Sequence, residues 1–92
     1  MNGVARISFD GGARLMPAHS RYDRELVFEE AEFFARRHGK ATLELNRSSI
    51  LVSSEPQGTD RGCSKCGKPL GALWFGVDAH LVCRRCARRT TR

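Results

Sequence analysis

The chain lacks long hydrophobic runs: none of its 92 residues belongs to a stretch approaching the ~18 apolar residues of a membrane helix. It also lacks the apolar core of a signal peptide after its opening residues. We therefore expect a soluble protein of the reducing cytoplasm, with no membrane partner. Hydrophobic residues make up only 40% of the chain, which gives a thin core at this size. Chains this short often need a metal or a partner for stability.

Cysteine is absent from the first 62 residues, and all four cysteines form two CxxC pairs. Cys63 and Cys66 make the first pair, and Cys83 and Cys86 make the second after sixteen intervening residues. This spacing predicts one structural, tetrahedral Zn²⁺ site, since two thiolates three residues apart can share a metal without strain. An iron site of the rubredoxin type would use the same four sulfurs and stays open. Disulfides do not suit a reducing compartment, and a thioredoxin-like redox site needs a single CxxC pair.

Acidic residues are nearly absent after Gly62. Residues 1–62 balance nine Lys and Arg against nine Asp and Glu, whereas residues 63–92 hold seven basic residues against Asp78 alone. The net charge of +6 therefore belongs to the cysteine-containing segment, although four zinc-bound thiolates would offset part of it. Such asymmetry favours a polyanionic partner, of which nucleic acid is the commonest. A basic tail that only aids solubility is the alternative.

Residues 1–53 predict a small α+β domain with the element order ββαββ. Alternating apolar residues and turn signals place its strands at residues 4–9, 13–16, 41–45 and 50–52. Asp10–Gly12 forms the first turn, and four residues, 46–49, join the second hairpin. One helix covers the resulting antiparallel sheet.

The helix is predicted from about Arg21 to His38. Ser20 and Asp23 have the spacing of a capping box, and Gly39 supplies the left-handed residue that commonly ends a helix. The predicted apolar stripe consists of Val27, Ala31, Phe34 and His38, widened by Leu26 and Phe33. The glutamates at 29, 30 and 32 are expected to form a solvated face, or to dock a basic surface such as that of another copy.

Residues 54–62 have the composition of a linker, and residues 63–92 are predicted to form a four-cysteine zinc finger with a basic C-terminal helix. Gly67 suits the tight turn after the first pair, while Leu73 and Trp74 are expected in a small core. The second pair would lie in the first turn of the final helix. This order of knuckle, hairpin and helix predicts a treble clef, with a zinc ribbon that lacks the helix as the alternative.

The segment from Cys63 to Gly67, followed by Leu73, Trp74 and the second cysteine pair, resembles the GATA-type zinc finger. That resemblance implies a Leu-Trp pair packed beneath the zinc and a following helix that enters the major groove of DNA. Cys63 to Leu70 with the second pair also resembles the zinc finger of DksA/TraR-type regulators, which bind RNA polymerase. Each resemblance covers about thirty residues, and residues 1–62 resemble no family.

Two functional hypotheses follow, and both belong to regulation of transcription. In the first, the finger binds DNA or another nucleic acid through seven basic residues: Lys65, Lys68, Arg84, Arg85, Arg88, Arg89 and Arg92. In the second, the zinc stabilises a protein-interaction adaptor, for example on RNA polymerase or another regulator. Tyr22, Phe28 and Phe33 would then be available for a surface, and the N-terminal part could form a homodimer.

An enzyme is not expected. Four cysteine ligands close the coordination shell and leave no position for water or substrate. His80, three residues before Cys83, is expected to support a sulfur or to pack in the hairpin.

Overall fold

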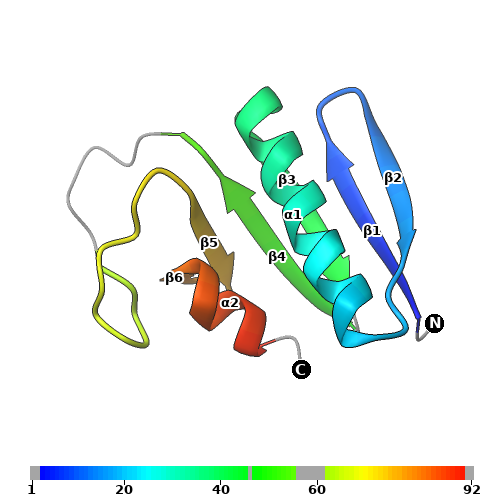
Figure 1. Ribbon diagram of the computed structural model, residues 1–92. Coiled ribbons are helices and arrows are strands. Elements are labelled where there is room, and N and C mark those ends of the chain that lie inside the picture. Colours follow the sequence, from blue (N-terminus) through cyan, green and yellow to red (C-terminus); the bar gives the residue numbers. More distant parts are fainter. Residues whose placement is uncertain (1–2, 46, 56–61, 91–92) are drawn as a thin grey trace.

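The computed structural model describes residues 3–45, 47–55 and 62–90 of the chain. They form an α+β fold with one six-stranded antiparallel sheet in the order β2-β1-β3-β4-β5-β6 and two helices (Figure 1). The elements are β1 (Val4–Phe9), β2 (Gly12–Pro17), α1 (Arg21–His38), β3 (Lys40–Leu45), β4 (Ser48–Ser53), β5 (Trp74–Val77), β6 (His80–Val82) and α2 (Arg84–Thr90).

The N-terminal hairpin and both ends of α1 confirm the predictions from the sequence. Phe9 pairs with Gly12 across the turn, where Gly11 adopts a φ of 104°. At the start of α1, the Ser20 hydroxyl accepts a hydrogen bond from the Asp23 N–H, and the Asp23 carboxylate accepts one from the Ser20 N–H. These two bonds form the capping box. The helix ends at Gly39, whose N–H donates to the Ala35 carbonyl.

The second hairpin has a shorter connection than the four residues predicted. β4 begins at Ser48, and Leu45 of β3 pairs with it directly. Residue 46 lies outside the described residues, and Arg47 has a positive φ of 68°. The connection thus spans two residues, 46 and 47, because the two serines classed as loop by their composition extend the strand.

The sheet continues from β4 into the cysteine-containing segment. Val52 of β4 pairs with Phe75 of β5, and Ser53 pairs with Trp74. Residues 56–61 of the expected linker lie outside the described residues. Ser54 is the first residue of the expected linker. Its hydroxyl donates a hydrogen bond to the Ala35 carbonyl and its N–H donates one to the Gly39 carbonyl, so Ser54 caps the end of α1. The division of the chain into two domains stays a prediction, but a ladder of backbone hydrogen bonds between β4 and β5 joins the two predicted domains.

Both helices pack on the same face of the sheet (Figure 1). α1 buries five residues, Val27, Phe28, Ala31, Glu32 and Ala35. Two expectations for α1 are wrong: Phe28 is 1% exposed rather than available for a surface, and Glu32 is 2% exposed rather than solvated. A third expectation is also wrong: Leu26, Phe33 and His38, expected on the buried stripe, are exposed.

The core is shared between α1 and the cysteine-containing segment. The ring of Phe28 lies 6.3 Å from that of Phe75 in β5, and Ala87 of α2 is fully buried in the same cluster. Leu73 and Trp74, expected in a small core, are half-buried and pack at the margin of this shared core. The Trp74 indole N–H instead donates to the Glu55 carbonyl at 2.9 Å.

Across the described residues, α1 and α2 lack the combination of length and hydropathy that membrane crossing requires.

Candidate metal centre

The first cysteine pair lies on a tight turn. The Cys63 N–H donates to the Lys68 carbonyl and the Gly67 N–H to the Cys63 carbonyl, which folds the backbone back on itself. Gly67 has a φ of 77°, as the sequence predicted for this turn. The Lys65 N–H points at the Cys63 sulfur, 3.4 Å away. Such N–H groups stabilise negative charge on a thiolate.

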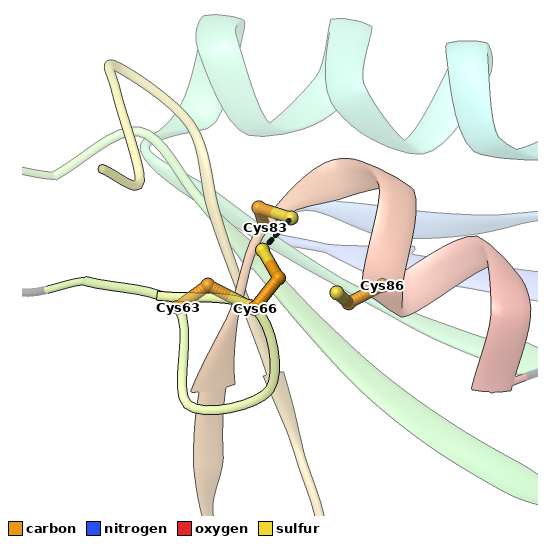
Figure 2. Close-up of side chains that lie close together, drawn as sticks. All are labelled: Cys63, Cys66, Cys83 and Cys86. Atoms are coloured by element: carbon orange, nitrogen blue, oxygen red, sulfur yellow. Dashed lines mark hydrogen bonds between the residues drawn. The ribbon is translucent and has the colours of Figure 1, made fainter. Parts of the chain in front are cut away.

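The second pair lies where β6 passes into α2. Cys83 precedes the helix, and its carbonyl accepts the Ala87 N–H, so Cys86 follows in the first helical turn. The Ser64 N–H donates to the Leu81 carbonyl, which fixes the turn of the first pair beside β6. The two pairs therefore face each other, as Figure 2 shows.

The four sulfur atoms of Cys63, Cys66, Cys83 and Cys86 lie within 4.8 Å of one another. A tetrahedral site with metal–sulfur bonds of ~2.3 Å has sulfurs ~3.8 Å apart. The Cys66 and Cys83 sulfurs, at 3.6 Å, already match that separation. Bringing a sulfur pair at 4.8 Å to the tetrahedral separation needs a movement of ~1 Å. Four soft donors with this geometry could hold one metal ion.

The thiols are unequal in acidity. Burial raises the pKa of Cys63, but hydrogen bonds from the backbone N–H groups of Cys83, Cys66 and Lys65 outweigh it and lower that pKa to about 6. Cys86 shares its proton with the Cys63 sulfur, which together with burial raises its pKa to about 12. One sulfur is therefore readily ionised at neutral pH. A metal cation would have to displace the proton of the other.

Two arginines of α2 are bound to glutamates of α1. Nε of Arg84 lies 2.6 Å from Oε2 of Glu32, and Arg88 forms an ion pair with Glu25. The guanidinium of Arg88 also lies 5.4 Å from the centre of the Phe28 ring and 3.9 Å from Oε2 of Glu32. Of the three glutamates expected to be solvated or to dock a basic surface, Glu32 contacts arginines of α2, Glu30 pairs with Arg14 of β2, and Glu29 is exposed.

Burial shifts the pKa values of two side chains in these ion pairs, Glu32 and Arg88. It raises the pKa of Glu32, although Arg84 and Arg36 act in the opposite direction. Burial likewise lowers the pKa of Arg88. Removing charges from water costs free energy, and here that cost exceeds what the ion pairs return to the carboxylate.

Four other predicted basic residues extend to the surface. Lys65, Lys68, Arg85 and Arg89 are exposed, and a shallow hollow beside the cluster is lined by Lys65, Cys66, Cys86 and Arg89. The row of Arg85 and Arg89 is therefore separate from the row of Arg84 and Arg88. Arg92 lies outside the described residues.

Sequence reasoning did not identify Glu25 and Glu32 as partners of α2. Glu25 and Glu32 are seven residues apart and therefore lie on one face of α1, and Arg84 and Arg88, four apart, lie on one face of α2. Two charged faces of opposite sign were the signal that could have predicted this contact. His80, expected to support a sulfur or to pack in the hairpin, is exposed at the start of β6, where it pairs with Val77 of β5.

The chain matches no protein-family model, and no curated protein or solved structure is significantly similar to it. The resemblances to GATA-type and DksA/TraR-type fingers thus stay predictions.

Proposed function

We propose that this chain is a small zinc-binding regulatory protein whose closed four-cysteine site is structural. The observation that carries the proposal is the gathering of four sulfurs within 4.8 Å from two CxxC pairs. An all-sulfur, four-donor set suits zinc and leaves no open position for catalysis, so the protein is proposed not to be an enzyme. Iron in the same site is distinguished by its colour and by metal analysis.

The order of a knuckle at the first pair, the β5–β6 hairpin and α2 supports the treble-clef assignment over a zinc ribbon, which lacks the helix. In such a module the metal joins the hairpin and the helix, neither of which is long enough to be stable alone. Here β5 is also paired with β4, so the proposed metal holds α2 against a sheet already formed by the rest of the chain.

We propose further that the exposed cations of the finger bind the phosphates of a nucleic acid. The exposure of Lys65, Lys68, Arg85 and Arg89 supports this, and Lys65 and Arg89 line the same hollow beside the cysteines. Arg84 and Arg88 are not assigned phosphate contacts, because glutamates of α1 already form ion pairs with them. Phosphate contacts of this kind give affinity without reading the base sequence.

Fluorescence anisotropy of labelled duplex DNA, titrated with zinc-loaded protein at two salt concentrations, tests this. Contacts from four cations predict a slope of log affinity against log salt of about −3 to −4. The variant Arg85→Glu/Arg89→Glu should lose most of the affinity and keep its zinc. Arg84→Gln is the matched control on the same helix and should bind within about twofold of the parent, since its charge is already paired. No binding at low salt would contradict the nucleic-acid proposal and leave the zinc proposal intact.

The adaptor hypothesis is favoured by a separate observation, the apolar side chains exposed on the outer face of α1.

A further inference from the structure

The four cysteines of the cluster differ in their access to solvent. Cys66 is exposed and Cys83 is half-buried. Cys63 and Cys86 are buried, at 4% and 7% exposure. A thiolate reacts with a small oxidant only where that oxidant can reach the sulfur. Cys66 is therefore the sulfur at which an oxidant from solvent reacts first, and this reaction needs no open position on a bound metal, because the reacting atom is the sulfur itself.

Cys66 lies beside a sulfur of the other cysteine pair. Its Sγ is 3.6 Å from that of Cys83, and Figure 2 shows the two side chains pointing toward each other. The sulfurs of a disulfide are ~2.05 Å apart, so an approach of ~1.5 Å would join them. An exposed thiolate with a second thiol beside it is the usual arrangement of a cysteine that responds to oxidation.

Two cations border the exposed sulfur. Lys65 and Arg89 line the hollow beside the cluster together with Cys66 and Cys86. With zinc bound, the four thiolates outweigh the charge of the ion, so the centre is negative and the two cations reduce that charge. A cation at this place also stabilises the negative charge that develops on the leaving oxygen of a peroxide. The hollow therefore suits a small, uncharged oxidant that releases an anion as it reacts.

We propose that Cys66 and Cys83 form a hydroperoxide-sensitive pair whose oxidation releases the metal. The Cys66 thiolate attacks one oxygen of hydrogen peroxide and becomes a sulfenic acid, while the other oxygen leaves as hydroxide. The Cys83 thiolate then attacks the Cys66 sulfur, which forms the disulfide and expels a second hydroxide. Two protons from solvent convert the two hydroxides into water. The two sulfurs together lose two electrons, and the peroxide gains them.

Oxidation of this pair removes two of the four metal ligands. Cys63 and Cys86 remain as thiols, and two sulfurs bind Zn²⁺ far more weakly than four. Cys86 lies in α2, so the ion no longer joins that helix to the first cysteine pair. The new disulfide instead links the turn of the first pair to the residue immediately before α2. This inference rests on the metal site of the proposed function and is independent of nucleic-acid binding.

Hydrogen peroxide added in slight excess to the zinc-loaded chain tests the proposal. A chromogenic chelator follows released zinc, and alkylation, tryptic digestion and mass spectrometry locate the oxidised cysteines. Because trypsin does not cleave before Pro69, Cys66 and Cys83 stay together in the peptide of residues 66–84, whereas Cys63 and Cys86 lie in other peptides. The expected result is zinc release together with a peptide 66–84 that is two hydrogen atoms lighter and resists alkylation, and a thiol reductant should restore both.

Other outcomes overturn the proposal. A disulfide between any other two cysteines would join two tryptic peptides and would show that Cys66 and Cys83 are not the reacting pair. Zinc release without a disulfide would contradict the second step. Cysteines that stay reduced in peroxide would contradict the first step.

The cations of the hollow have their own test. Arg89→Gln should slow disulfide formation roughly three- to tenfold, because the leaving hydroxide loses a neighbouring positive charge. Arg85→Gln is the matched control: Arg85 is exposed on the same helix but lies outside the lining of the hollow, and its replacement should leave the rate within about twofold. Equal rates in the two variants would overturn the part assigned to the hollow.

The same measurements separate this inference from the proposed function. A chain that holds no zinc before oxidation would contradict the structural zinc site, and the peptide 66–84 would still report whether the disulfide forms. A chain that holds one zinc and keeps it, with all four cysteines reduced in peroxide, would overturn only the inference.

Discussion

Oε2 of Glu32 in α1 lies 2.6 Å from Nε of Arg84, the first residue of α2. This contact joins the helix between the N-terminal hairpins to the helix that carries Cys86. Because Glu32 is buried, the cost of removing its carboxylate from water offsets much of what this contact adds to stability. Arg84 is thus occupied within the chain before any partner binds.

The raised pKa of Glu32 predicts how stability changes with pH. A carboxyl group with a folded pKa above its unfolded value binds its proton more tightly in the folded state. Its contribution is therefore full below the unfolded pKa of about 4.5 and is lost as pH rises through the folded pKa. The free energy of unfolding of the parent minus that of Glu32→Gln should rise as pH falls from 7 toward the unfolded pKa of about 4.5, by at most about 1.4 kcal/mol per unit.

Urea unfolding of both proteins at each pH measures that difference, and effects of acid on the metal site cancel between them. Glu29→Gln, a change at an exposed glutamate of the same helix, should give a flat difference. A difference that grows with pH would mean that Arg84 outweighs burial.

Loss of one cysteine should abolish metal binding. Cys63→Ala removes one of four sulfurs, and we expect bound zinc, measured by mass spectrometry of the metal, to fall from about one per chain to near zero. Ser64→Ala is the neighbouring control, because the bond of Ser64 to Leu81 uses its backbone N–H. Full zinc content in Cys63→Ala would contradict the four-ligand site.

The turn between β5 and β6 offers a stabilising substitution. Asp78 and Ala79 have φ values of 50° and 68°, the left-handed pair that a two-residue hairpin turn requires. Glycine adopts this conformation without the steric cost paid by alanine, so Ala79→Gly should raise the free energy of unfolding by about 0.5–1 kcal/mol. Ala13→Gly, at an exposed strand position, should lower it by a similar amount. Thermal or urea unfolding distinguishes the two, and a loss of stability in Ala79→Gly would contradict the turn assignment.

Trp74 should report on its bond to the Glu55 carbonyl. Trp74→Phe keeps most of the apolar contact but removes the indole N–H, and the free energy of unfolding should fall by about 1 kcal/mol. Trp74→Ala should cost about 2 kcal/mol, less than the 3–5 kcal/mol of a fully buried tryptophan. An emission spectrum of fully hydrated indole in the native protein would contradict this contact.

Local patterns were sufficient to predict the first hairpin, both ends of α1 and the four cysteines. Ser20, Asp23 and Gly39 cap α1 through hydrogen bonds to residues within four positions along the chain, so the sequence alone predicts where the helix begins and ends. The spacing of three residues within each cysteine pair likewise predicts that its two sulfurs can bind one metal ion. The burial of Glu32 depends instead on a helix fifty residues later, and no local pattern contains that information. The pairing of β4 with β5 is equally non-local. It also explains the half-burial of Trp74, which pairs with Ser53 in the ladder rather than filling a separate core.

The position of β5 beside β4 has a consequence for the protein when it is short of metal. β5 and β6 cover the edge of β4, a strand whose Ile50, Leu51 and Val52 form a continuous apolar run. If the hairpin detaches when the cysteines lose their ion, β4 becomes an open edge with unpaired backbone groups, the usual starting point for strand-to-strand aggregation. Loss of the metal would then increase the rate of aggregation as well as change the structure.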